Sequence, residues 1–224
     1  MADPSASLTL LEACWRDLVL GVIQGLTEFL PISSTAHLKV VPELLGWGDP
    51  GVSVTAAIQL GSVVAVIAYF CTDLSQVLRG IGRAFRYGQW REPEARLGFA
   101  MVVGTLPILL IGLGIKFAWA QGYEQSPLRS IPSIAIVSIV MALLLALAER
   151  VGARRKQLPV VSGRDGLLVG LAQALALLPG VSRSGSTLTA ALFDGWQRAD
   201  AARFSFLWAF PPSPSRVWWS LKML

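Results

Sequence analysis

The chain has 224 residues, of which 54% are hydrophobic and only 15% are charged, and its mean hydropathy is +0.58. A soluble domain usually carries about 25% charged residues, so this composition excludes a water-soluble globule and a disordered chain and indicates an integral membrane protein. We expect no nucleic-acid partner despite the net charge of +5, because the basic residues gather in connections between apolar segments. Two cysteines and a single histidine exclude a His/Cys zinc cluster.

The first apolar segment, Leu18–Leu30, is too short to cross a bilayer, because as a helix it would extend only about 20 Å. It runs into Pro31 and then into the hydroxyl residues Ser33, Ser34 and Thr35. A short interrupted segment of this kind is typical of a re-entrant or broken helix around a site within the membrane. The alternative interpretation is an ordinary helix end followed by serines in a loop.

Three side chains in and after this segment are candidates for chemistry. Gln24 and Glu28 are four residues apart, so they share one helix face, and His37 is the only histidine of the chain. An ionisable group in an apolar segment is costly, which makes Glu28 a functional candidate. Its carboxylate could bind a divalent cation or act as a base, and the imidazole could transfer a proton. The neighbouring hydroxyls either cap the next helix or belong to the same site.

Three later segments reach the length of about 20 apolar residues that a bilayer core requires. They are Val52–Cys71, Leu97–Ala118 and Ile131–Ala148. We predict a transmembrane helix for each of them.

The basic residues predict the orientation of these spans. Thr72–Arg96 and Arg150–Asp165 each carry five basic residues, whereas Trp119–Ser130 carries one. Because loops rich in Lys and Arg stay on the cytoplasmic side, we expect both basic connections to be cytoplasmic. Two predicted spans lie between them, and an even number of crossings returns the chain to the same side, so this assignment is self-consistent.

The second short apolar segment, Gly166–Pro179, resembles the first. Gly170–Gln173 repeats the Gly-x-x-Gln pattern of Gly21–Gln24, and in both places an apolar turn, a Leu-Pro pair and hydroxyl residues follow. Repeats that share a central site are a common plan of membrane proteins. We therefore predict that the two short segments meet within the membrane.

Arg183 is the only charge in the turn that follows the second segment, where Ser182, Ser184 and Thr187 surround it. A guanidinium among hydroxyls and backbone donors suits bidentate recognition of phosphate. The alternative is a structural ion pair with Glu28. An arginine, a carboxylate, an imidazole and several hydroxyls at membrane depth together favour phosphoryl chemistry on a lipid head group.

The stretches Gln24–Leu38 and Leu178–Thr187 resemble the two signatures of the undecaprenyl-diphosphate phosphatase family, also called the bacitracin-resistance proteins, and the likeness extends from about Leu10 to Phe210. The resemblance implies a multi-pass hydrolase of the bacterial cell (inner) membrane that removes the terminal phosphate from undecaprenyl diphosphate. It would thereby recycle the lipid carrier for peptidoglycan synthesis and confer resistance to bacitracin. It also implies a divalent cation, Mg²⁺ or Ca²⁺, as cofactor.

The resemblance assigns roles residue by residue. The positions that match catalytic residues are Glu28, Ser34, His37 and Arg183, and Glu28 is also the expected metal ligand. The positions that match substrate-binding residues are Gln24, Ser33, Thr35, Ser182, Ser184 and Thr187. The nucleophile stays open between Ser34, His37 and a metal-activated water.

The resemblance ends near the C-terminus, where the family continues through further helices and this chain instead has the proline-rich residues 211–224. We interpret this departure as a truncation or a change of reading frame, and we expect the chain to release phosphate poorly without those helices. The expected architecture is an all-α, polytopic membrane protein with three clear transmembrane helices, two re-entrant motifs and an internal repeat. It forms one membrane domain over residues 1–224, with repeat halves at about 10–130 and 131–210.

Three other classes of protein are alternatives to this family. A type-2 phosphatidate phosphatase needs two histidines, and this chain has one. A transporter or flippase for a phosphorylated lipid suits the repeat and the broken helices, and it remains the alternative function. A purely structural subunit gives no reason for Glu28, His37 and Arg183. The expected partners are a prenyl diphosphate lipid and membrane lipids, and a homo-oligomer is left open.

Overall fold

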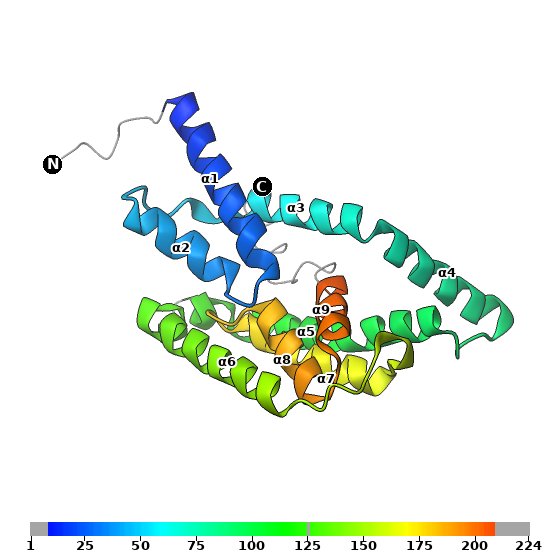
Figure 1. The fold of residues 1–224 in the computed structure, drawn as a ribbon. Helices are drawn as coiled ribbons and strands as arrows, with labels where there is room; N and C mark the ends of the chain where they lie inside the picture. Colours follow the sequence, from blue (N-terminus) through cyan, green and yellow to red (C-terminus); the bar gives the residue numbers. More distant parts are fainter. Residues whose placement is uncertain (1–8, 125, 209–224) are drawn as a thin grey trace.

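The computed structural model describes residues 9–124 and 126–208, and within these residues the chain is helical without any named strand (Figure 1). The α-helices are α1 (Leu10–Phe29), α2 (Ser34–Leu44), α3 (Gly51–Tyr69), α4 (Cys71–Tyr87), α5 (Pro93–Glu124), α6 (Ile131–Val151), α7 (Gly163–Ala174), α8 (Arg183–Phe193) and α9 (Arg198–Leu207). Short 3₁₀ turns are η1 (Pro127–Arg129), η2 (Leu158–Val160) and η3 (Leu175–Leu177). The predicted all-α class is confirmed. The atypical tail at 211–224 lies outside the described residues.

Two of the three predicted spans are confirmed as continuous helices. The segments Pro93–Ala118 of α5 and Ile131–Val151 of α6 are each long and apolar enough to cross a membrane. Most of the surface of α6 is open, with Leu143 66% exposed, as expected of a helix whose side chains face lipid. The protein is therefore a polytopic membrane protein.

The third predicted span, Val52–Cys71, needs a correction. The helix ends at Tyr69, and the chain turns by 70° into α4, so that in the described residues this segment meets the criteria for a span only together with α4. The segment Thr72–Arg96, expected as a connection, is mostly helical as α4. Helix α4 is amphipathic, because Val77, Gly80 and Ala84 repeat every three to four residues and form one buried face. Its mean hydropathy is low because arginines and other polar residues lie between the apolar ones.

Helix α1 is also longer than expected from the apolar segment Leu18–Leu30. It begins at Leu10, where Thr9 and Glu12 form a reciprocal capping box, and it has 20 residues. The charged residues of its first turns ended the apolar pattern in the sequence, but they did not end the helix. By contrast, the second short segment is broken as predicted, because α7 ends at Ala174 and a 3₁₀ turn follows.

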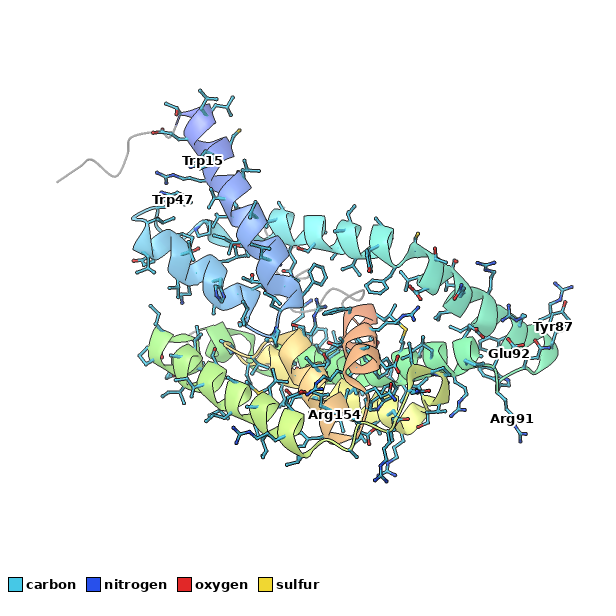
Figure 2. All side chains as sticks on the ribbon, viewed as in Figure 1. Trp15, Trp47, Tyr87, Arg91, Glu92 and Arg154 are labelled. Atoms are coloured by element: carbon cyan, nitrogen blue, oxygen red, sulfur yellow. The ribbon has the colours of Figure 1, made fainter. Side chains whose placement is uncertain are left out.

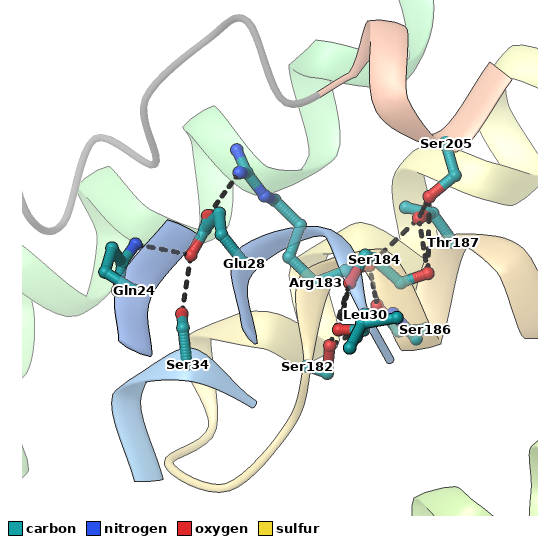
Figure 3. A network of polar contacts seen from close by, with 11 residues as sticks. Gln24, Glu28, Leu30, Ser34, Ser182, Arg183, Ser184, Ser186, Thr187 and Ser205 are labelled. Atoms are coloured by element: carbon teal, nitrogen blue, oxygen red, sulfur yellow. Dashed lines mark hydrogen bonds and ion pairs between the residues drawn. The ribbon is translucent and has the colours of Figure 1, made fainter. Parts of the chain in front are cut away.

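The repeat corresponds to two helical hairpins. Helices α1 and α2 form one hairpin, and α7 and α8 form the other, and the turn of the first meets the start of α8 (Figures 1 and 3). The prediction that the two short segments meet is confirmed.

Glycines fix the second hairpin against α5. Gly104 of α5 faces Gly166 and Gly170 of α7 so closely that a Cβ at Gly170 would lie 2.1 Å from the Gly104 carbonyl oxygen. Close backbone approach through small residues is how helices associate inside membranes. Helix α9 then packs on α8 through Phe204, which stacks on Trp196, and both side chains are fully buried.

The two basic segments lie at the same end of the molecule. Arg96, at the start of α5, donates a hydrogen bond of 2.9 Å to the carbonyl of Val160 in η2. This contact agrees with the prediction that both basic connections share one side of the membrane.

Candidate active site

A buried ion pair joins the two sequence motifs (Figure 3). Arg183 Nη2, at the start of α8, lies 2.7 Å from Glu28 Oε1, near the end of α1, and the two side chains are 14% and 8% exposed. A charged pair withdrawn this far from solvent strongly couples the two hairpins, because removing either partner leaves the other charge buried without this counterion.

The other carboxylate oxygen of Glu28 accepts two further hydrogen bonds. Gln24 Nε2 donates over 2.8 Å from the preceding turn of α1, and Ser34 Oγ donates over 2.5 Å from the first residue of α2. A hydroxyl on a carboxylate at this distance is a strong, charge-assisted hydrogen bond. Glu28 is thus the point at which both hairpins converge.

The turn between α1 and α2 is strained at Ser33. This residue has φ 59°, in the left-handed region that non-glycine residues rarely adopt, and it is the N-cap of α2 without a side-chain capping bond. The expectation that its hydroxyl caps the helix is therefore wrong for Ser33. The conformation allows Ser34 to reach Glu28.

His37 contacts the backbone of the turn that precedes α2. His37 Nδ1 is 3.0 Å from the carbonyl oxygen of Ser33, and the ring is partly buried. Because a carbonyl only accepts, Nδ1 carries the proton in this contact, and Nε2 is the basic nitrogen. His37 follows Ser34 by three residues and so shares its helix face. Thr35 is exposed.

On the opposite hairpin, serines fix the start of α8 and bind the first motif. Ser182 Oγ caps α8 by accepting from the Gly185 amide over 3.1 Å. Ser184 Oγ lies 3.0 Å from Ser182 Oγ and donates to the Leu30 carbonyl over 3.0 Å. Together with the ion pair, this bond places Arg183 against the end of α1.

Thr187 is fully buried, so it lies behind Arg183 rather than on an open surface. Its Oγ1 lies 2.9 Å from the Arg183 carbonyl oxygen and 2.6 Å from Ser205 Oγ of α9. Ser186 Oγ donates to the same carbonyl over 3.0 Å. No sequence pattern distinguished Ser186 or Ser205, because the first continues a run of hydroxyls and the second lies in a different helix.

The paired glutamines of the repeat are both buried. Gln24 and Gln173 are each 1% exposed, and within the described residues the Oε1 atom of each has no hydrogen-bond partner. For Gln24 this places an uncompensated amide oxygen beside the carboxylate of Glu28. Buried polar atoms without a partner are rare and point to a bound water, ion or ligand group.

The donors around Glu28 are compatible with a hard cation. A carboxylate, an amide oxygen and a hydroxyl are the ligand types of Mg²⁺ and Ca²⁺. No group of three His, Cys, Asp or Glu side chains that could hold a metal occurs in the described residues. Glu28 would supply a carboxylate ligand, and substrate oxygens and water would complete the coordination, as is common for Mg²⁺.

A second charged cluster closes the other end of the α7–α8 hairpin. Lys156 Nζ lies 2.8 Å from Asp165 Oδ1 and 2.7 Å from Asp194 Oδ2, and Trp196 Nε1 donates to Asp194 over 3.0 Å. Burial raises the pKa of Asp165, but hydrogen bonds from Lys156 and Ser162 outweigh this effect and lower the pKa to about 2.

Comparison with known proteins identifies the family. Residues 17–217 match the family described as Bacitracin resistance protein BacA, so the chain belongs to this family.

Relatives named undecaprenyl-diphosphatase are similar along most of the chain. The protein of Synechococcus sp. (strain CC9605) is 92% identical over 211 residues, which are 94% of this chain and 74% of the relative. That of Parasynechococcus marenigrum (strain WH8102) is 81% identical with the same coverage. That of Prochlorococcus marinus (strain MIT 9303) is 74% identical over 202 residues, 90% of this chain and 69% of the relative.

Proposed function

We propose that this protein hydrolyses undecaprenyl diphosphate to undecaprenyl phosphate and inorganic phosphate, recycles the lipid carrier for peptidoglycan synthesis and confers resistance to bacitracin. Membership of the bacitracin resistance family and the names of the similar relatives support this function. The observation that carries it is the buried contact of Arg183 with Glu28, which joins a phosphate-binding group and a catalytic carboxylate from the two motifs.

Arg183 binds the diphosphate. Its guanidinium matches the geometry of phosphate oxygens bidentately, and it stands at the N-terminus of α8, where the helix dipole favours an anion. The diphosphate replaces Glu28 as the partner of Arg183, so substrate binding releases the carboxylate. Ser182 and Ser184 hold the start of α8, and Thr187 positions the Arg183 backbone from behind.

Ser34 is the nucleophile in this proposal, favoured over His37 and water by its bond of 2.5 Å to Glu28 Oε2. Its oxygen attacks the terminal phosphorus while its proton passes to Glu28. The bond from that phosphorus to the bridging oxygen breaks, and undecaprenyl phosphate leaves with the electron pair. Water then hydrolyses the phosphoserine.

His37 assists the second half of the reaction. In the neutral ring, donation from Nδ1 to the Ser33 carbonyl leaves Nε2 as the accepting nitrogen, and Nε2 takes the proton of the water that attacks phosphoserine. We assign the exposed Thr35 and the buried Ser33 no direct chemical step. Ser33 contributes the carbonyl that orients His37 and the strained turn that presents Ser34.

A divalent cation, Mg²⁺ or Ca²⁺, would be held by Glu28 and by the buried amide oxygen of Gln24. When bound, the cation supplies positive charge that offsets the charge of the phosphate oxygens. Its site depends on the amide orientation of Gln24, which donates Nε2 to Glu28 in this structure.

The site opens toward the outer face of the bacterial inner membrane. The turn before α8 lies near the start of α6, since Ser138 Oγ donates to the Gly180 carbonyl over 3.0 Å. The end of α6, at Arg150, belongs to the connection predicted to be cytoplasmic. The spent lipid carrier would therefore reach Arg183 from the outer leaflet.

Release of inorganic phosphate tests the function. Purified protein in detergent is mixed with a prenyl diphosphate and Mg²⁺, alone and with a chelator, and the assay is repeated on a form continued with the C-terminal segment of the Synechococcus relative. We expect release of phosphate that depends on the cation. No release from either form would contradict the proposal.

A transporter of phosphorylated lipid is the second candidate, favoured by the two hairpins that meet end to end. Transfer of a fluorescent prenyl phosphate across vesicle membranes, without release of phosphate from the diphosphate, would support this candidate over the hydrolase. The bond between Ser34 and Glu28 favours hydrolysis, because transport has no need of an activated hydroxyl.

A further inference from the structure

Helix α4 leaves the axis of α3 by 70°, and Val54–Tyr69 of α3 meets the criteria for a span only together with α4. The 19 residues of α3 extend about 28 Å, close to the thickness of a hydrocarbon core of about 30 Å. Because of the bend, α4 does not continue the direction of α3 through the membrane.

The contacts of α4 place it at the depth of charged groups. Gly80, in the middle of α4, lies so close to the start of α5 that a Cβ there would be 2.5 Å from Glu94 Cβ. The 32 residues of α5 extend about 48 Å, so its charged first turn, with Glu94 and Arg96, projects beyond the hydrocarbon core. The middle of α4 thus lies at the membrane interface.

The open surface of α4 has an apolar ridge. Leu78 and Phe85 are two helical turns apart on one face and are 69% and 76% exposed. Trp90, 45% exposed, continues the ridge by packing edge-to-face on Phe85, with ring centroids 4.9 Å apart. Aromatic residues at such positions are typical of the membrane interface.

A row of arginines runs beside this ridge. Arg79 and Arg86 are also two turns apart, and Arg91 follows in the turn beyond α4, where it projects from the far end of the molecule (Figure 2). All three are exposed, and among the described residues none of them pairs with a carboxylate, whereas Arg83 pairs with Glu92 at 2.7 Å. Arg79 donates to Ser75, and Arg86 lies over the ring of Tyr87, so neither positive charge is neutralised. A row of guanidiniums beside an apolar ridge is complementary to a lipid surface that presents phosphates over hydrocarbon.

We propose that Leu78, Phe85 and Trp90 with Arg79, Arg86 and Arg91 form an interfacial surface that binds anionic phospholipid headgroups of the cytoplasmic leaflet. The ridge enters the acyl boundary, and the three guanidiniums bind headgroup phosphates. This surface, called the α4 surface below, is separate from the Glu28–Arg183 site and does not depend on hydrolysis.

Binding of phosphatidylglycerol tests the charged row. The protein in detergent is titrated with phosphatidylglycerol or phosphatidylcholine, and bound lipids are counted by native mass spectrometry. A surface arginine contributes about fivefold to binding of an anionic lipid surface, so Arg79→Gln, Arg86→Gln and Arg91→Gln together should weaken the preference for phosphatidylglycerol roughly 100-fold. The matched control replaces Arg150, Arg155 and Arg164, three exposed arginines of the other basic segment, by Gln. An unchanged preference in the first triple variant, or an equal loss in the control, would overturn the proposal.

The depth of the apolar ridge in the bilayer gives an independent test. Cys14 and Cys71, both free thiols, are replaced by Ser, and a fluorophore is attached to Leu78→Cys or to Gln76→Cys in vesicles of phosphatidylglycerol and phosphatidylcholine with brominated acyl chains. Gln76 is also exposed but points about 160° away from Leu78 around the helix. Strong quenching at position 78 with weak quenching at 76 is expected. If quenching at position 78 is absent or equals that at position 76, the ridge does not face lipid, and the proposal is overturned.

Discussion

Arg183 Nη2 donates a hydrogen bond of 2.7 Å to Glu28 Oε1 across a sequence separation of 155 residues. The contact unites the two halves of the repeat in one buried network. From the sequence, Arg183 could either pair with Glu28 or bind phosphate. The two roles are compatible, because a resting ion pair with Glu28 keeps the guanidinium in place for a diphosphate that later replaces the carboxylate.

Removal of either partner should destabilise the protein. Arg183→Ala removes the buried counterion of Glu28, at a cost of about 3 kcal/mol in the free energy of unfolding. Glu28→Gln should cost a similar amount, and the double variant should cost about 1–3 kcal/mol less than the sum. The measurement is SDS-induced unfolding followed by circular dichroism. Additive effects would show that the two charges do not interact.

Thr187 does not contact the substrate in this proposal, but loss of its hydroxyl should disturb the position of Arg183. Thr187→Val removes the hydroxyl that contacts Ser205 and the Arg183 carbonyl, whereas Ser205 keeps its bond to the Ser184 carbonyl. We expect about a tenfold loss of phosphate release, mainly through a higher KM, because a lost hydrogen bond costs about 0.5–1.5 kcal/mol. Thr187→Ser keeps the hydroxyl and should restore the KM. The control is Thr189→Val, whose hydroxyl bonds the Gly185 carbonyl on the same helix. An equal rise of KM in the control would remove the special role of Thr187.

The contact of α5 with α7 should tolerate no side chain at Gly104. A Cβ there would lie 2.2 Å from the Gly166 carbonyl oxygen, so Gly104→Ala should cost about 3 kcal/mol through overpacking. Gly114→Ala, on the same helix with open space around it, should be neutral or slightly stabilising. Thermal unfolding in detergent compares the two variants, and equal melting temperatures would contradict the observed packing.

Asp165 should make the stability depend on pH below about 4. Its pKa of about 2 in the folded protein lies below the ordinary value of 3.8, so its contribution is present above pH 3.8 and is lost as the pH falls through 2. The contribution is roughly 1–2 kcal/mol. Melting temperatures measured between pH 5 and 2 should fall less steeply for Asp165→Asn than for the unmodified protein. Parallel curves would show that Asp165 titrates normally.

Hydropathy alone predicted the parts of the fold whose side chains face lipid. Helices α5 and α6 were predicted because their sequences are apolar on all sides, as a bilayer requires. Helix α4 was missed, because one buried stripe among arginines lowers the hydropathy to that of a loop. The bend at Phe70 was also missed, since the apolar pattern of α3 runs through it.

The candidate site was predictable where the sequence carries charge in an apolar setting. Glu28 and Arg183 were identified in this way, and the repeat predicted that their segments meet. The bond of Ser34 to Glu28 required the left-handed conformation of Ser33, for which no sequence signal exists. Ser205 was missed because its contact with Thr187 depends on how α9 folds back onto α8.

Phosphate release by matched pairs of variants tests the central claim that Glu28 and Arg183 act together on a diphosphate. Glu28→Gln is compared with Glu43→Gln, an exposed carboxylate of α2, and Arg183→Ala with Arg155→Ala, an exposed arginine. We expect both site variants to lose about 10²–10³ in rate and both controls to stay within about twofold of the unmodified protein. Near-normal turnover in either site variant would contradict the account.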